Sequence, residues 1–243
     1  MQFSSLQAVA RFYSQRAHHS LEQLPEGRVT LTVSVTRSTD RCCLWVGVMQ
    51  GKALVSCPET MAPQIEGVLG DLETPGQLRA GAVIDRLLAI ATAERNVEIY
   101  QGVKLACDDS TFRPATTDGV RKLTVESAPT VIRHLARIGI PDDVGYLLHD
   151  STAYAYYIGE NPVSFAATHP CEAEDIGNMM VGTLQEHRRR GYGKTSASAT
   201  TSEVLRQGRT PVWGTEADNH AAIRTAESLG YERFCWVCEV RVS

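Results

Sequence analysis

Residues 181–193 read Val-Gly-Thr-Leu-Gln-Glu-His-Arg-Arg-Arg-Gly-Tyr-Gly, and this run decides the fold of the second half of the chain. An apolar stretch leads into a short loop with three arginines and two glycines, and a helix is predicted to follow. A helix N-terminus offers N–H groups without partners and a partial positive charge. Glycines let the backbone approach a phosphate closely, and arginines add charge-assisted hydrogen bonds. The run therefore predicts an anion-binding site.

The segments around this run alternate between predicted strands and helices. A helix is predicted from Thr124 to about residue 138, and a second from about residue 190 to residue 207, where Gly208 suits a helix end. The further predicted elements are strands at 152–158, 163–169, 176–184, 212–215 and 232–242 and a helix at 219–229 that Gly230 ends. Such alternation indicates an α/β fold with mixed α+β layers.

The first half of the chain also predicts strands and helices, but no function. Its clearest signal is the alternation of apolar and polar residues from Arg28 to Thr36, the period of a half-buried strand. Further strands are predicted at 44–49, 52–56 and 97–106, and helices at 58–72 and 78–93, with Thr74-Pro75 as a helix start. The polar stretch 108–111 marks a junction. We therefore expect a smaller N-terminal α/β domain of unknown role at 1–108 and a second domain at 109–243.

The spacing Arg188-x-x-Gly191-x-Gly193 resembles the pyrophosphate-binding motif of the GCN5-related N-acetyltransferase (GNAT) family. A second signature of the family follows in the right order: a strand at 211–215, then Asn219 opening a helix, then Leu-Gly-Tyr at 229–231. The resemblance covers roughly residues 113–243, and the strong motif matches lie within 181–231. The chain also resembles the subgroup that includes zwittermicin-type self-resistance acetyltransferases.

The resemblance implies an acetyl-CoA-dependent N-acetyltransferase with a GNAT-like C-terminal fold, in which two strands splay near Trp213 to admit cofactor and acceptor. It implies that the amides of Thr183 and Leu184 pair with the pantetheine arm, and that the Thr183 amide polarises the thioester carbonyl. The remaining cofactor contacts that it implies are Arg188, Arg189, Arg190, Gly191, Tyr192, Gly193, Lys194 and the side chain of Asn219. The acceptor amine would attack the thioester directly after losing a proton to a base.

The proton-transfer residues of the family are not matched. Gly177 stands where the family often has a glutamate base, and Ala226 where it often has a tyrosine acid. We therefore hypothesise that Asp175, the nearest carboxylate of the same strand parity, is the base, acting directly or through water. His169, Glu172 and Glu216 are the other candidates for this role.

Composition and short motifs exclude several other classes. The net charge of −4 argues against a nucleic-acid or anionic-membrane binder, and no apolar stretch approaches the roughly 18 residues that span a bilayer. Seven cysteines without regular spacing and the lack of a signal peptide fit a reducing cytoplasm. A nucleotide-binding P-loop would need a glycine at Arg188, and the pair Cys235 and Cys238 has no second pair for a metal, so we expect no metal site.

The expected function is transfer of acetyl from acetyl-CoA to the amine of a small molecule. Two alternatives stay open: a catalytically inactive acyl-CoA-binding protein with this fold, and a structural or partner-binding protein. Gly177 and Ala226 are the features that favour the first alternative.

Overall fold

A computed structural model of the 243-residue chain describes residues 10, 23–33, 42–49, 51–92, 97–124, 126–127, 131, 152–169 and 174–242. The chain divides into two compact units. Unit 1 contains 105–214 and 219–232, and unit 2 contains 10–104, 215–218 and 233–243. The expected junction at 108 lies close to the boundary at 104/105, but the last strand, expected in the second domain, belongs to unit 2.

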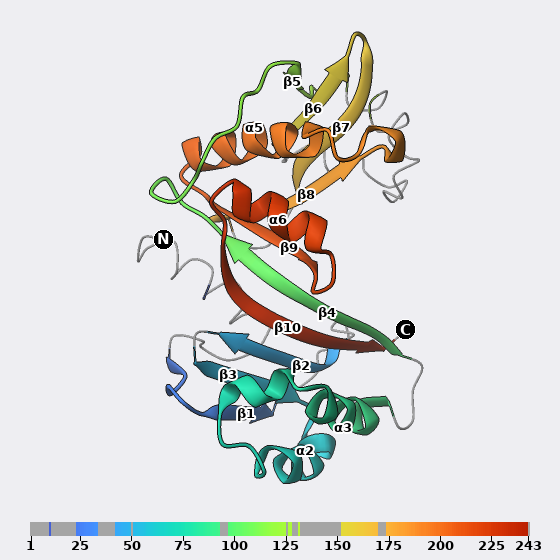
Figure 1. Cartoon of the computed structure of the whole chain (residues 1–243). Helices are drawn as coiled ribbons and strands as arrows, with labels where there is room; N and C mark the ends of the chain where they lie inside the picture. The colour runs from blue at the N-terminus through green and yellow to red at the C-terminus, as the bar shows by residue number, and fades with distance from the viewer. Residues whose placement is uncertain are drawn as a thin grey trace. The chain divides into compact units, whose positions relative to one another are not determined.

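Unit 2 is a sheet with two helices on one face (Figure 1). Its strands are β1 (Val29–Val33), β2 (Cys42–Met49), β3 (Lys52–Cys57), β4 (Val97–Ala106) and β10 (Glu232–Val242), in the spatial order β1-β3-β2-β10-β4. β1 pairs in parallel with β3, whereas β2 is antiparallel to both β3 and β10. Gly51, with a positive φ of 82°, turns the chain between β2 and β3, as the predicted hairpin requires.

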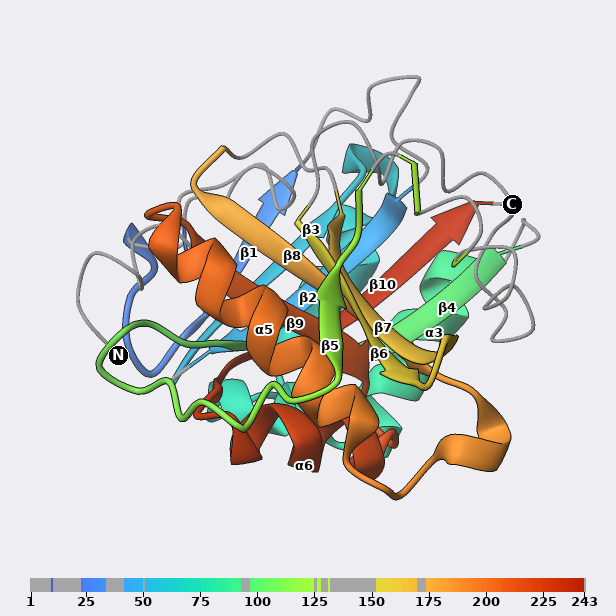
Figure 2. The ribbon, with the colours of Figure 1, turned by 90° about the horizontal axis from the view of Figure 1, so that it is seen from above.

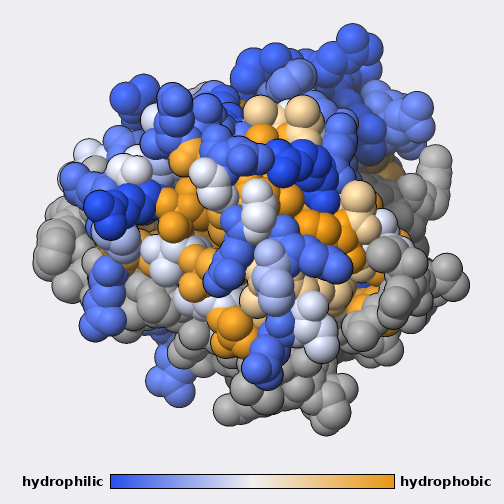
Figure 3. Space-filling model, turned by 90° about the horizontal axis from the view of Figure 1, so that it is seen from below, coloured by the Kyte–Doolittle hydropathy of each residue, from blue (hydrophilic) through white to orange (hydrophobic). Residues whose placement is uncertain are grey.

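The helices of unit 2 are α2 (Ala62–Leu69), preceded by a 3-10 turn at Glu59–Met61, and α3 (Gly81–Thr92). At the predicted helix start, Thr74 forms a capping box with Gln77. The helix that follows is the 3-10 helix Pro75–Arg79, which ends at Ala80 because the backbone there is extended. Ile65 and Leu87, one from each helix, are completely buried. The face seen from below in Figure 3 shows apolar side chains among hydrophilic ones.

Unit 1 contains the sheet strands that follow one another in the spatial order β9-β8-β7-β6-β5. Its strands are β5 (Val120–Lys122), β6 (Ala153–Ile158), β7 (Asn161–His169), β8 (Ile176–Thr183) and β9 (Thr210–Glu216), and its helices are α5 (Tyr192–Arg206) and α6 (His220–Ser228). β8 and β9 are parallel, whereas the pairs β5–β6, β6–β7 and β7–β8 are antiparallel. The predicted helix at 124–138 lies almost entirely outside the described residues, and β5 was not predicted.

Helix α5 lies across one face of this sheet (Figure 2). Its residues Ser196 to Thr201 are small and buried, so that the helix backbone approaches the strands closely. The Thr200 hydroxyl donates to Ala166 O on β7 at 3.0 Å, and a β-carbon on Gly177 of β8 would lie 2.5 Å from Val204 of the helix. The opposite face of the sheet carries an apolar cluster of Val131, Ala153, Ala155, Phe165, Ala167 and Leu184.

Candidate cofactor site at the β8–α5 junction

A sharp loop joins the end of β8 to the start of α5. Leu184 precedes a 3-10 turn, Gln185–His187, and Gly191 caps α5 with a φ of 86°. Arg189 also has a positive φ, 62°, a conformation that costs a non-glycine residue about 1–2 kcal/mol. The strained turn places three exposed arginines, at 188–190, directly before the helix.

The first turn of α5 presents N–H groups to this loop. Its first helical bond runs from Thr195 N to Gly191 O, at 3.0 Å. The N–H groups of Tyr192, Gly193 and Lys194 therefore have no acceptor within the helix. Together with the partial positive charge of the helix end and the nearby arginines, they form a site suited to a phosphate or diphosphate.

Gly193 fixes how closely the helix meets the strand. A β-carbon at this position would lie 2.8 Å from Thr183 Oγ1. Thr183 Oγ1 is itself held, at 2.9 Å, by Ser164 Oγ, which also donates to Gly182 O at 2.8 Å. The absence of a side chain at 193 thus lets the exposed N–H groups of α5 lie directly beside the end of β8.

The sheet opens between β8 and β9 beside this junction. The parallel register runs from Ile176 opposite Thr210 to Met179 opposite Trp213 and extends no further between these two described strands. Burial changes at the same point, because every β8 residue from Met180 to Thr183 is only half-buried. The second half of β8 therefore has one paired edge, along β7, and one open edge.

Strand parity decides which amides face the open edge. Leu184 N donates to Val163 O on β7 at 3.0 Å, and the β7–β8 register is regular through Ser164 opposite Thr183. Since successive residues of a strand direct their N–H groups to opposite edges, the N–H groups of Thr183 and Val181 point away from β7. The carbonyl of Thr183 points the same way and accepts from Arg188 Nε at 3.2 Å.

The β7–β8 register distinguishes the Thr183 amide from the Leu184 amide, although the resemblance implies that both pair with the pantetheine arm. The Leu184 amide already has its acceptor, and the Leu184 side chain belongs to the apolar cluster. The Thr183 amide faces the opening, and Val181, which the sequence did not single out, directs a second amide into it. The sequence alone could not show which amides face the opening, because this depends on the register with β7, which is a long-range property.

The segment from Asn219 to Tyr231 shows why the second signature has its form. Asn219 caps α6, with its side-chain oxygen accepting from Ala222 N at 3.2 Å. At the other end, Gly230 has a φ of 89°, and a β-carbon there would lie 1.9 Å from Thr111 O. Tyr231 is buried against Trp213, with ring centroids 5.6 Å apart, and its hydroxyl is 2.7 Å from Thr201 Oγ1 on α5. Leu-Gly-Tyr therefore locks α6 against α5 and β9.

The comparisons with known proteins agree with this geometry. The model of the FR47-like protein family matches residues 162–240. A protein from Novosphingobium aromaticivorans, described as an acetyltransferase from the GNAT family, superposes with a TM-score of 0.52 at 19% identity, covering 61% of this chain and 67% of its own. An acetyltransferase of the GNAT family from Colwellia psychrerythraea gives 0.51 at 14% identity, covering 65% and 61%. The chain has the GNAT fold.

A Drosophila protein gives a TM-score of 0.52 at 13% identity, covering 67% of this chain and 58% of its own. In two of these three matches the chain spans less than two thirds of the other protein. Among curated protein sequences, no match was found. The opening between β8 and β9 lies where the GNAT resemblance predicts that two strands splay, beside Trp213.

Asp175 does not lie near the amides of this GNAT-like site. It precedes β8, and its carbonyl accepts from Thr210 N at 2.8 Å, at the closed end of the β8–β9 pair. Val181 and Thr183 lie six and eight positions further along the chain, about 20 Å and about 26 Å along an extended strand. Gly177 is packed against Val204, so no carboxylate fits there either. We therefore do not retain Asp175 as the base. Glu172 lies outside the described residues, and Glu216 is exposed at the end of β9.

An aromatic contact that the sequence did not predict lies at the start of α5. The rings of Tyr156 on β6 and Tyr192 are stacked, with centroids 4.3 Å apart. The His187 and Tyr192 ring centroids are 6.3 Å apart, and the buried Nδ1 of His187 has no hydrogen-bond partner among the described residues. Trp213, near which the resemblance predicts that two strands splay, is buried.

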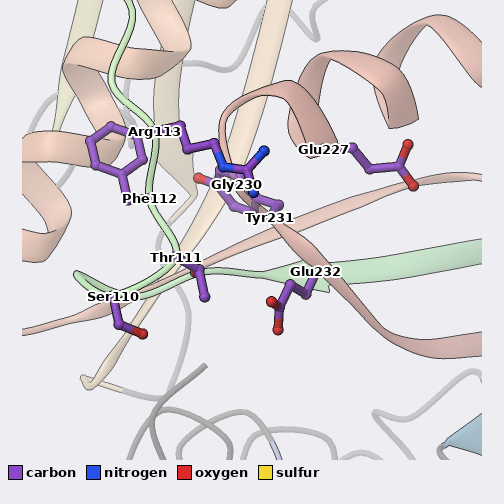
Figure 4. Close-up of a pocket in the computed structure, with 8 residues that line it drawn as sticks. All are labelled: Ser110, Thr111, Phe112, Arg113, Glu227, Gly230, Tyr231 and Glu232. Atoms are coloured by element: carbon purple, nitrogen blue, oxygen red, sulfur yellow. The ribbon is translucent and has the colours of Figure 1, made fainter.

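A separate pocket of about 270 Å³ lies away from this junction (Figure 4). It is formed by the segment after β4 and by the C-terminal end of α6, whereas Asn219 caps the N-terminal end of that helix. Its lining residues are Ser110, Thr111, Phe112, Arg113, Glu227, Gly230, Tyr231 and Glu232. No residue of the β8–α5 loop contributes to it.

The described residues offer little to metal or redox chemistry. They contain no group of three or more His, Cys, Asp or Glu side chains that could hold a metal ion. Cys235 and Cys238 are buried in β10, and burial raises the pKa of these thiols to about 12 and about 11, so both stay protonated. Over the same ranges, no helix is long and apolar enough to cross a membrane.

Proposed function

We propose that the protein transfers an acetyl group from acetyl-CoA to the amine of a small molecule. The observation that carries this proposal is the open edge of β8, where the amides of Thr183 and Val181 lead from the interior of the sheet to the N-terminus of α5. An extended pantetheine arm carries amide groups that can pair with such an edge, as a neighbouring strand would. The GNAT fold supports the same assignment.

In this proposal the diphosphate of acetyl-CoA binds the amides from Arg189 to Lys194, and the arginines at 188–190 add charge. Gly193 supplies the fit, because a side chain there would fill the space between the helix start and Thr183. The side-chain oxygen of Asn219 caps α6, which leaves its amide N–H groups for the cofactor.

Acetyl-CoA supplies an activated acetyl group as its thioester. The amide of Thr183 or Val181 would stabilise negative charge on the thioester oxygen. The likeness to zwittermicin-type self-resistance enzymes remains part of the proposal, and it motivates an amine-bearing acceptor.

The first test is the melting temperature with and without saturating acetyl-CoA, with ATP and magnesium as the control. A ligand at a hundred times its Kd stabilises by about 2.7 kcal/mol, which raises the melting temperature of a chain of this size by several degrees. We expect a rise with acetyl-CoA that the double variant Arg188→Ala/Gly191→Asp loses. No rise with any acyl-CoA would sink the proposal.

Two variants at one position separate the amide from the side chain. Thr183→Pro removes the N–H group that faces the opening and spares the β7 ladder, whereas Thr183→Val keeps the N–H group and removes the hydroxyl. We expect the proline variant to lose the acetyl-CoA shift and the valine variant to keep it.

Turnover is then measured as release of free CoA thiol with a panel of small amines. Release that depends on the amine supports the transferase. Tight acetyl-CoA binding without release for any amine or peptide N-terminus would favour the inactive acyl-CoA-binding alternative, for which Gly177 and the buried Ala226 leave no acid or base at the family's usual positions.

A further inference from the structure

Two polar residues interrupt the apolar face of the unit 1 sheet that lies opposite α5. On β7, Phe165 and Ala167 belong to the apolar cluster, and His169 continues their row. On β8, Met180 packs against the same cluster, and Asn178 precedes it in the same row. His169 and Asn178 are directly opposite each other in the register, and both are half-buried.

This pair lies at the closed end of the opening. Asn178 is followed by Met179, the last β8 residue in register with β9. The Val181 amide, which faces the opening, is three residues beyond Asn178, about 10 Å along the strand. A histidine side chain together with one bound water can cover much of this span. The pair therefore lies on the strand that carries the Val181 amide, one of the two amides proposed to bind the thioester oxygen.

Burial favours the neutral form of the His169 imidazole. Burial lowers its pKa below the ordinary 6.5. Across β8 it faces Asn178, while β6 brings Thr152 and Ala153 to the neighbouring part of β7, and none of these is ionisable. Along β8 the nearest carboxylate is Asp175, of the opposite parity, and Tyr157 lies at the far end of β6. A neutral imidazole can accept a proton at pH 7.

We propose that His169 is the general base of the reaction. This inference rests on the proposed function. The neutral imidazole, directly or through one water, takes a proton from the ammonium group of the acceptor. The free amine forms a C–N bond to the thioester carbon. The C–S bond then breaks, CoA leaves as a thiolate that takes the second proton from the former amine, and His169 returns its proton to solvent.

The decisive experiment is the pH dependence of kcat/KM for wild type and His169→Gln. Because the base must be neutral, wild-type kcat/KM should fall as the pH drops through the lowered pKa of His169, below 6.5. In the variant, kcat/KM at pH 7 should fall by about 10²–10⁴-fold and lose this limb, rising instead with pH up to the pKa of the acceptor amine. His187 and His220 remain in the variant, so loss of the limb would be specific to position 169.

A second variant guards against a folding defect. His169→Ala should regain activity when imidazole is added, in proportion to the unprotonated imidazole, and both variants should keep the acetyl-CoA melting shift. An unchanged pH profile in a folded His169→Gln protein that still turns over would overturn the assignment and leave the transferase intact. Loss of the acetyl-CoA shift in wild type would instead overturn the proposed function itself.

Discussion

Gly193 on α5 meets Thr183 on β8 so closely that a β-carbon at 193 would lie 2.8 Å from the threonine hydroxyl oxygen. That hydroxyl cannot move away freely, because it is also 2.9 Å from Ser164 Oγ. The contact couples the phosphate end of the candidate site to the strand that would bind the pantetheine arm.

Gly193→Ala should therefore weaken acetyl-CoA binding by about tenfold or more, since the helix start must shift by a few tenths of an ångström and misalign its N–H groups. The measurement is acetyl-CoA affinity by calorimetry. Gly67→Ala in α2 is the matched control: nothing lies within 4 Å of its β-carbon, so affinity should not change and stability should rise slightly. Equal affinity in both variants would refute the coupling.

Gly230→Ala should destabilise the protein severely. The residue would be strained by its φ of 89°, costing about 1–2 kcal/mol, and its methyl group would collide with Thr111 O, adding about 1–3 kcal/mol. Gly208→Ala has a similar φ of 72° but open space, so it should show the strain alone. Urea denaturation of both variants measures the difference, and equal losses would argue against the close approach.

The variant Arg189→Gly tests whether the strained backbone at Arg189 contributes to acetyl-CoA binding. Glycine relieves a φ of 62°, worth about 1–2 kcal/mol, and loses about 0.5–1 kcal/mol through the flexibility of the unfolded chain. The unliganded variant should be as stable as wild type or slightly more so, while acetyl-CoA affinity falls. Arg190→Gly, which relieves no positive φ, should be less stable than wild type. Undiminished affinity in Arg189→Gly would mean that the backbone amides alone hold the phosphates.

Glu203 should make stability depend on pH in acid. Its hydrogen bond with Arg206, with help from Lys122, lowers its pKa from 4.5 to about 2. Because the folded pKa is the lower one, the stabilisation is complete above about pH 4.5 and is lost as the pH falls towards 2. Arg206 and Lys122 are 71% and 56% exposed, so solvent screening limits the contribution to about 1 kcal/mol.

Glu203→Gln should thus lose about 1 kcal/mol at pH 7 and differ less from wild type at pH 3, as measured by urea denaturation at both pH values. Glu160→Gln is the control, because the Arg121–Glu160 pair is exposed on both sides and should leave stability unchanged. A difference from wild type that is the same at both pH values would show that Glu203 acts through packing rather than charge.

Local signals predicted much of the fold. The strand at 97–106 has the predicted bounds, Asn219 caps its helix, and Gly191, Gly208 and Gly230 adopt the positive φ that a turn or helix end demands. These features depend on residues within a few positions of one another. The three-residue strand β5 escaped prediction because it is too short to show a period.

Long-range relationships could not be predicted in the same way. Parity suggested Asp175 as a base, but only the β8–β9 register shows that this residue lies at the closed end. Only the pairing with β7 shows that the Leu184 amide is occupied and that the Val181 amide is not. Likewise, nothing local to the final strand indicates that it completes the sheet of unit 2.

The alternating parity of β8 implies an alternating pattern of hydrogen exchange. The amides of Gly182 and Leu184 point to β7 and should exchange slowly whether or not a ligand is present, while those of Val181 and Thr183 face the opening and should exchange rapidly in the unliganded protein. A molecule that lies along the open edge would slow every second amide and leave its neighbours as they were. Isotope uptake at these four consecutive residues would then show that the opening is filled. It would also show that the bound molecule lies along the edge of β8 that faces away from β7.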